Sequence, residues 1–120
     1  MNTPRLFQSF RHAFRGVAVA FEQELSFRLQ LVAGLVVLSA AWVFRVRPSE
    51  WIVLIFLVGA VLVLELINSV FERLADAFKP RIHPMVRDVK DLMAATVLFV
   101  AAAAAVIGTL IFLPYLRPYL

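Results

Sequence analysis

The chain has 120 residues, 62% of them hydrophobic, and a formal net charge of +4. A soluble domain of this length cannot bury so large an apolar share, so the composition indicates a single domain, residues 1–120, in a lipid bilayer. The absence of cysteine excludes disulfides, and two histidines are too few for a histidine-built metal site, so any metal must bind through oxygen. The basic residues lie between apolar runs without an aromatic platform, which argues against a nucleic-acid partner.

An amphipathic helix is expected over residues 5–27. Its apolar residues recur at steps of three and four, at Phe7, Phe10, Phe14, Val17 and Phe21. This pattern favours a helix lying in the membrane interface, although packing on the protein's own helices explains the later part equally well. The apolar stretch 16–21 is too short for a signal peptide and is closed by acids, so we expect no cleavage.

Three apolar runs then predict transmembrane helices over residues 28–46, 49–78 and 86–115. The first run is short, so either Arg28 and Arg45 reach toward opposite interfaces or the helix extends past its apolar part. Prolines at the seams, Pro114 among them, are expected to end the helices. The four glycines lie singly inside helical runs and predict close helix packing, as does the alanine run 101–105. The fold class is therefore an all-α membrane protein with an interfacial helix and three spans.

Orientation follows from the basic residues. Residues 1–28 and 72–91 hold nine of the 12 Lys and Arg residues, whereas the 45–50 turn and the C-terminus hold three. The positive-inside rule then predicts that the N-terminus and the connection between the second and third spans face the cytoplasm. Seven of the eight acids lie on that same side.

A polar stripe runs along the second span. Glu65, Asn68, Glu72 and Asp76 are spaced so that they fall within roughly 80° of one another on one helix face. An acid as deep in an apolar run as Glu65 is functional by default. The alternatives are a helix-end charge ladder paired with Arg73 or Lys79, or a polar contact between helices.

Two further clusters adjoin the spans. Asp88, Lys90 and Asp91 lie at the entrance to the third span, just before Leu92. Asp91 is equally well explained by compensation of the helix dipole, whereas a lysine at a helix start suggests a nearby anion. Glu22, Glu24 and Arg28 precede the first span, and Glu24 and Arg28 read alone are best explained as an i,i+4 pair.

Together, oxygen ligands, a lysine and a buried carboxylate at one interface are what magnesium-dependent phosphoryl transfer requires. The sequence contains neither a Walker motif nor a kinase glycine loop, so a phosphate site would have to be built from side chains. A raised pKa in apolar surroundings would let a carboxylate accept the proton of an attacking hydroxyl.

The pattern Glu65-x-x-Asn68-Ser69-x-x-Glu72-x-x-x-Asp76, followed by Lys90-Asp91, resembles the signature of the prokaryotic diacylglycerol kinase family, which includes the undecaprenol kinases. Arg15-Gly16, Phe27-Arg28, His83-Pro84 and the three-span plan also fall in register. The resemblance implies a homotrimeric lipid kinase of the bacterial cytoplasmic membrane that uses ATP and Mg²⁺.

The resemblance also implies roles for individual residues. Glu65 would be the general base, and Asn68 would help to place it. Glu24 and Glu72 would hold magnesium. The nucleotide would meet both of these carboxylates and Arg5, His12, His83, Lys90 and Asp91. The lipid would contact Glu65, Phe27, Arg28 and Ala94, with Asp76 in support.

Departures from the family pattern concern the acceptor. The diacylglycerol-specific members carry Gly and Ser where this chain has Met93 and Ala94, and an acid where it has Gln30. Pro48-Ser49-Glu50-Trp51 looks more like the undecaprenol kinases. The expected reaction is phosphorylation of diacylglycerol to phosphatidic acid, with undecaprenol as the alternative acceptor.

Two other functions compete with the kinase. A lone membrane carboxylate such as Glu65 is typical of a proton relay in a small transporter, but the first and third spans carry few polar residues. A non-enzymatic helical assembly fits the alanine-rich spans and leaves the cluster of acids and a lysine unexplained.

Overall fold

A computed structural model describes residues 3–77 and 84–120. The chain forms four α-helices and a short 3₁₀ helix: α1 (Thr3–Gln23), α2 (Leu25–Phe44), α3 (Pro48–Ala77), α4 (Pro84–Leu116) and η1 (Arg117–Tyr119). The described residues contain no strand. The α2 helix, the α3 helix and the α4–η1 segment are each long and apolar enough to cross a membrane. The expected all-helical architecture with three spans is therefore confirmed.

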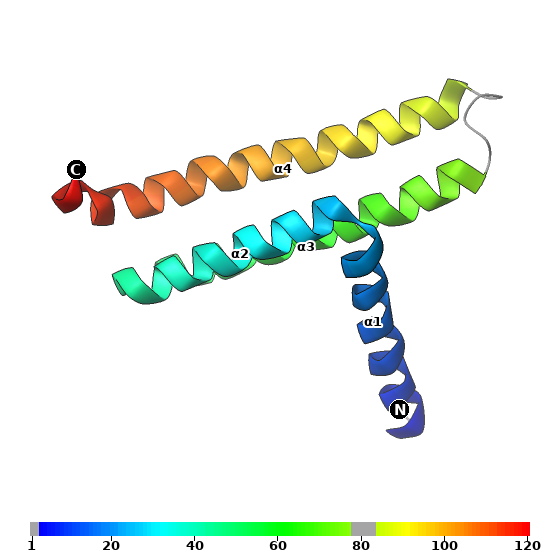
Figure 1. The fold of residues 1–120 in the computed structure, drawn as a ribbon, viewed down its shortest axis with the longest axis horizontal. Helices are drawn as coiled ribbons and strands as arrows, with labels where there is room; N and C mark the ends of the chain where they lie inside the picture. The colour runs from blue at the N-terminus through cyan, green and yellow to red at the C-terminus, as the bar shows by residue number, and fades with distance from the viewer. Residues whose placement is uncertain (1–2, 78–83) are drawn as a thin grey trace.

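The three long helices run alongside one another in alternating directions, and α1 leaves them at a steep angle (Figure 1). We call the end where α1 joins the bundle the α1 end; there α2 begins, α3 ends and α4 begins. The opposite end, which holds the turn between α2 and α3 and the C-terminus, is called the far end. This arrangement gathers residues from all four helices at the α1 end.

The break between α1 and α2 falls at Glu24, not at residue 27 as the sequence predicted. Glu24 has extended backbone angles of φ −117° and ψ 107°. The Arg28 guanidinium donates hydrogen bonds to the backbone oxygens of Phe21 (2.7 Å) and Glu22 (3.0 Å). These bonds satisfy carbonyl groups that have no partner within α1. Because α2 begins at Leu25, its 20 residues span about 30 Å, so the short apolar run is extended within one helix.

The turn between α2 and α3 is tight and well capped. Arg45 adopts a left-handed conformation with φ 52°, and the N–H groups of Arg45 and Val46 donate to Trp42 and Ala41. This is the bonding pattern of a Schellman motif with arginine in the position that favours glycine. The carboxylate of Glu50 accepts a bond of 3.0 Å from the Arg47 N–H and so caps the start of α3.

The apolar core lies at the far end. Ala41, Val46 and Leu54 are buried there, with partly buried side chains of all three long helices packed around them. The Tyr115 hydroxyl on α4 donates a hydrogen bond to the Glu50 carboxylate on α3. The α4 helix continues through Pro114 to Leu116, so the expectation that this proline ends the helix is wrong. A proline near a C-terminus removes only one ladder bond, and the aromatic contacts of this end hold the last turn.

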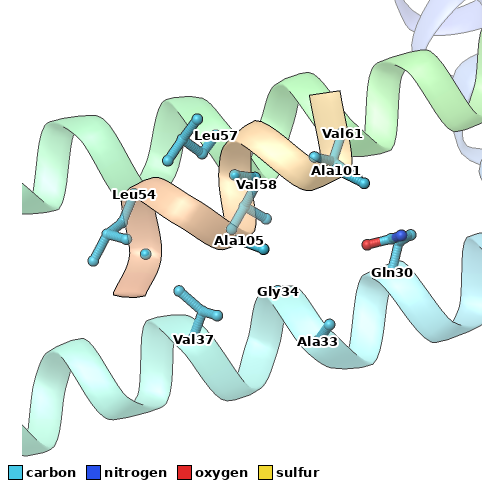
Figure 2. A pocket seen from close by; sticks show the side chains of 12 residues that line it. Gln30, Ala33, Gly34, Val37, Leu54, Leu57, Val58, Val61, Ala101 and Ala105 are labelled. Carbon is cyan, nitrogen blue, oxygen red and sulfur yellow. The ribbon is translucent and has the colours of Figure 1, made fainter. Parts of the chain in front are cut away.

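Close packing at glycine is confirmed at Gly34 alone among the four glycines of this single chain. A Cβ at Gly34 would lie 2.7 Å from Cγ1 of Val58 on α3, whereas one at Gly16, Gly59 or Gly108 would meet nothing within 4 Å. The alanine run does not pack tightly either. Ala101, Ala104 and Ala105 line a cavity of about 200 Å³ between α2, α3 and α4 (Figure 2).

Candidate functional site

The polar stripe of α3 points into the protein at the α1 end except at Asp76, whose side chain is 63% exposed. Glu65 is only 5% exposed, and Ser69 beside it is buried too. The Asn68 amide donates a hydrogen bond of 3.2 Å to the Glu72 carboxylate, as expected for residues one turn apart on a helix. The Asn68 Oδ1 atom is buried and has no hydrogen-bond partner among the described residues. An orphaned acceptor at such depth marks a place where a donor or a cation is expected.

Glu24 joins this stripe from the break between α1 and α2. Its carboxylate and that of Glu72 are both close enough to Glu65 to interact with it electrostatically. We call Glu24, Glu65 and Glu72 the carboxylate cluster. Because Glu24 stands where the chain leaves helical geometry, its side chain can turn toward α3 rather than follow the surface of α2.

A basic residue flanks the cluster on each side. Arg73 Nη2 lies 3.5 Å from Glu24 Oε1 and 2.7 Å from Gln23 Oε1, so α3 is tied to the α1–α2 junction. Lys90 Nζ lies 2.8 Å from Asp76 Oδ1, which ties α4 to α3. Lys90 also interacts electrostatically with Glu72. The lysine at the start of a helix thus has its anion within the same chain.

The donor set fits a divalent cation shared with a phosphate. In the described part of the chain, no three acidic or imidazole side chains converge closely enough to hold a metal ion by themselves. Magnesium in phosphoryl-transfer sites is typically held by one or two carboxylates and completes its shell with phosphate oxygens and water. Glu24, Glu72 and the unpartnered Asn68 oxygen offer such a partial shell.

Several residues expected at the site stand apart from the cluster. Arg5 and His12 are exposed on α1, and Asp91 and Ala94 are exposed on α4. Phe27 is only 3% exposed. His83 lies outside the described residues. Arg28 does not pair with Glu24 as the i,i+4 interpretation predicted, because its guanidinium is engaged by the backbone oxygens that end α1.

Arg73 and Gln23 are the site residues that sequence reasoning missed. Arg73 was considered only as a partner for acids on its own helix, yet it pairs with Glu24, about 50 positions earlier in the chain. Helical spacing carries no information on such a contact, which depends on the break at Glu24. The available signal was the isolated arginine directly after Glu72.

The fold and site define an all-helical membrane protein that carries a row of carboxylates flanked by two basic groups at one end of three spans. A family model described as prokaryotic diacylglycerol kinase matches residues 11–112. The chain is 34% identical over 112 residues to an undecaprenol kinase of Bacillus subtilis, covering 93% of this chain and 91% of that protein.

Two relatives named diacylglycerol kinase also match. The Synechocystis protein is 33% identical over 112 residues, which are 92% of this chain and 64% of the relative. The Pseudomonas aeruginosa protein is 26% identical over 110 residues, which are 87% and 89% of the two chains. The chain therefore belongs to the prokaryotic diacylglycerol kinase family. It is a membrane-spanning lipid kinase, and membership implies ATP, a lipid substrate and a divalent metal ion.

Proposed function

We propose that the chain transfers the γ-phosphoryl group of ATP to the hydroxyl of a membrane lipid at the carboxylate cluster. The observation that carries this assignment is the burial of Glu65 beside Glu24 and Glu72, at the end of the bundle that also holds Lys90. Phosphoryl transfer depends on positioning and on stabilisation of charge, and these groups supply both functions without a phosphate-binding loop.

In the proposed reaction Glu65 accepts the proton of the lipid hydroxyl, which Asn68 helps to orient. The hydroxyl oxygen attacks the γ-phosphorus, the bond from that phosphorus to the β–γ bridging oxygen breaks, and ADP leaves. Lys90 contacts the phosphates, and its ammonium group is held near them by the bond to Asp76. Asp91, Arg5, His12 and His83 complete the proposed nucleotide site, and α1 would have to approach the bundle for its residues to do so.

Glu24 and Glu72 would hold the divalent ion, for which we propose Mg²⁺. When bound, the ion would neutralise the negative charge of the phosphates. The Glu72 carboxylate is already oriented by the Asn68 amide, which leaves its other oxygen for a ligand. A carboxylate held in this way needs little reorganisation when a cation arrives.

For the acceptor we propose a polyprenol such as undecaprenol, with diacylglycerol as the second candidate. The cavity of about 200 Å³ shares Val37, Ala104, Ala105 and Gly108 with a second hollow of about 330 Å³, so an apolar groove runs between α2 and α4 toward the far end. Gln30 and Val61 stand at its other end (Figure 2). Val61 is one turn from Glu65. A single groove whose lining stops one helical turn short of Glu65 suits one long chain bearing a terminal hydroxyl, and the undecaprenol kinase relative supports this choice.

The proposed groove is tested with a matched pair of alanine substitutions. Ala105→Phe fills the groove and should raise the KM for the lipid while the KM for ATP stays the same. Ala103→Phe adds the same ring roughly 200° around α4, away from the lining, and should change neither. Equal effects of the two substitutions would remove the groove from the proposal.

The placement in the membrane and the assembly are proposed as well. The α1 end would face the cytoplasm of a bacterium at its inner membrane, where ATP is available, with α1 in the interface through its exposed phenylalanines. A homotrimer is supported by α4, which buries none of its residues in the single chain. Chemical cross-linking in native membranes tests the trimer, and a purely monomeric pattern would exclude it.

The central experiment is a lipid panel. Purified protein in mixed micelles receives labelled ATP, Mg²⁺ and either undecaprenol or diacylglycerol, and we expect label in the polyprenol first. Glu65→Gln and Glu72→Ala should each abolish transfer while spectra and assembly stay unchanged. No label in any lipid would end the kinase assignment, and an active Glu65→Gln would remove Glu65 as the base.

A further inference from the structure

Two arginines hold the junction between α1 and α2, and they do so differently. Arg28 binds backbone oxygens and ends α1. Arg73 reaches from α3 to the side chains of Gln23 and Glu24. Its bond to the neutral Gln23 oxygen is short at 2.7 Å, whereas the distance to the charged Glu24 oxygen is 3.5 Å.

These distances separate an anchor from a charge partner. The 2.7 Å bond to Gln23 fixes where the Arg73 guanidinium stands. At 3.5 Å the contact with Glu24 is an ion pair at the edge of hydrogen bonding, and both side chains are partly exposed, at 50% for Arg73 and 24% for Glu24. The Glu24 carboxylate is therefore neutralised but not enclosed, and it remains open to another cation.

The need for such a charge follows from the cluster. Glu24 and Glu72 both interact electrostatically with the buried Glu65, and a cation nearby reduces the repulsion between like charges. Lys90 is held by Asp76 on the other side of the stripe. Of the basic groups that the structure describes, Arg73 is the one paired with Glu24.

We propose that Arg73 is a placeholder cation, which neutralises Glu24 while the metal site is empty and gives up this partner when a divalent ion binds. The inference rests on the proposed role of Glu24 as a metal ligand. Gln23 keeps the guanidinium nearby after the exchange, so the same arginine stands ready to pair again when the ion leaves. Arg73 acts through Glu24 and is a positioning residue, not a catalytic one.

A purely structural clamp predicts the opposite sign. If Arg73 served only to place Glu24 toward the ion, its removal would scatter the ligand and weaken metal binding. If it is a placeholder, its removal abolishes both the competing pair and the repulsion between guanidinium and ion, so metal binds more tightly. The affinity of the metal alone therefore separates the two roles.

The test uses the full chain in detergent micelles with Mn²⁺ as the probe, measured by the paramagnetic resonance signal of the free ion. We expect Arg73→Met to bind Mn²⁺ about two- to five-fold more tightly, the range given by a partly exposed ion pair. In EDTA, the thermal midpoint of Arg73→Met should lie below that of the unaltered chain. Added Mn²⁺ should raise the midpoint of Arg73→Met by more than it raises the midpoint of the unaltered chain. Arg73→Lys keeps the charge and should behave nearly as the unaltered chain does.

Arg87→Met is the matched control. Arg87 is exposed near the start of α4, at the same end of the bundle as Arg73, and takes part in no ion pair that the described residues form. It should leave Mn²⁺ affinity unchanged. Weaker or equal binding by Arg73→Met would overturn the proposal, as would Mn²⁺ binding that survives Glu24→Gln at full strength. The lipid panel decides the kinase assignment separately, since phosphate transfer by the unaltered chain does not depend on this comparison.

Discussion

Gly34→Ala tests how tightly α2 must approach α3 for the site to form. The added Cβ would lie 2.7 Å from Cγ1 of Val58, with Cγ2 and Cβ of the same side chain at 3.6 and 3.7 Å. Carbon atoms in good contact are about 3.5–4.0 Å apart, so one methyl group is about 1 Å too close. Either Val58 rotates or the two helices separate.

The expected loss of stability is about 1–2 kcal/mol. Overpacking in a tight interface typically destabilises by about 1–3 kcal/mol, and a branched valine has few other rotamers to adopt. Val58 borders the groove, which gives it some room to turn and favours the lower part of that range. The gain of about 0.8–1 kcal/mol that alanine brings over glycine in water is small here, because the bilayer already enforces the helix.

Unfolding of the micelle-bound protein by SDS measures this change, with Gly59→Ala as the control, since a Cβ there meets nothing within 4 Å. Adding Val58→Ala to Gly34→Ala should restore part of the lost stability, which a double-mutant cycle detects as coupling. Because α2 starts beside Glu24, kinase activity should fall along with stability. Equal stability of Gly34→Ala and Gly59→Ala, or no coupling to Val58, would refute the steric argument.

Three further predictions concern other contacts. Tyr115→Phe removes the bond to Glu50 and should destabilise the protein by about 1–2 kcal/mol while the KM values stay unchanged. Tyr119→Phe, at an exposed ring, should change neither the stability nor the KM values. Arg45→Gly removes the steric strain of the left-handed conformation and should stabilise the protein by about 0.5–1 kcal/mol, seen as a higher SDS midpoint. A lower midpoint would contradict this. Lys90→Met should raise the KM for ATP roughly tenfold, as loss of a charged phosphate contact does, whereas Arg87→Met should not.

The spans and the polar stripe could be predicted because both depend on short-range regularities. Apolar runs long enough for a bilayer need no partner to be recognised, and the spacing from Glu65 to Glu72 defines one face of any helix. The Asn68–Glu72 bond confirms that face directly. The residue types at one interface indicated phosphoryl transfer, and the family signature added the lipid acceptor and the roles of individual residues.

The rest depends on how the helices meet. Arg28 and Glu24 have the spacing of a helical pair, but the chain breaks between α1 and α2, so each finds another partner. The packing role of a glycine is decided by what stands opposite, which is why Gly34 meets Val58 while Gly59 meets open space in this chain. The Tyr115–Glu50 bond likewise joins residues that no local pattern connects.

The two ends of the bundle are fastened by different forces, and this has a consequence for how the molecule can open. Apolar side chains, rings and the Tyr115–Glu50 hydrogen bond hold the far end, whereas α4 and the α1–α2 junction are tied to α3 at the α1 end by ion pairs. Salt screens partly exposed charges and leaves buried apolar contacts intact. We therefore expect rising ionic strength, or an incoming polyanion that replaces one partner of these ion pairs, to separate the helices at the α1 end while the packed far end stays closed.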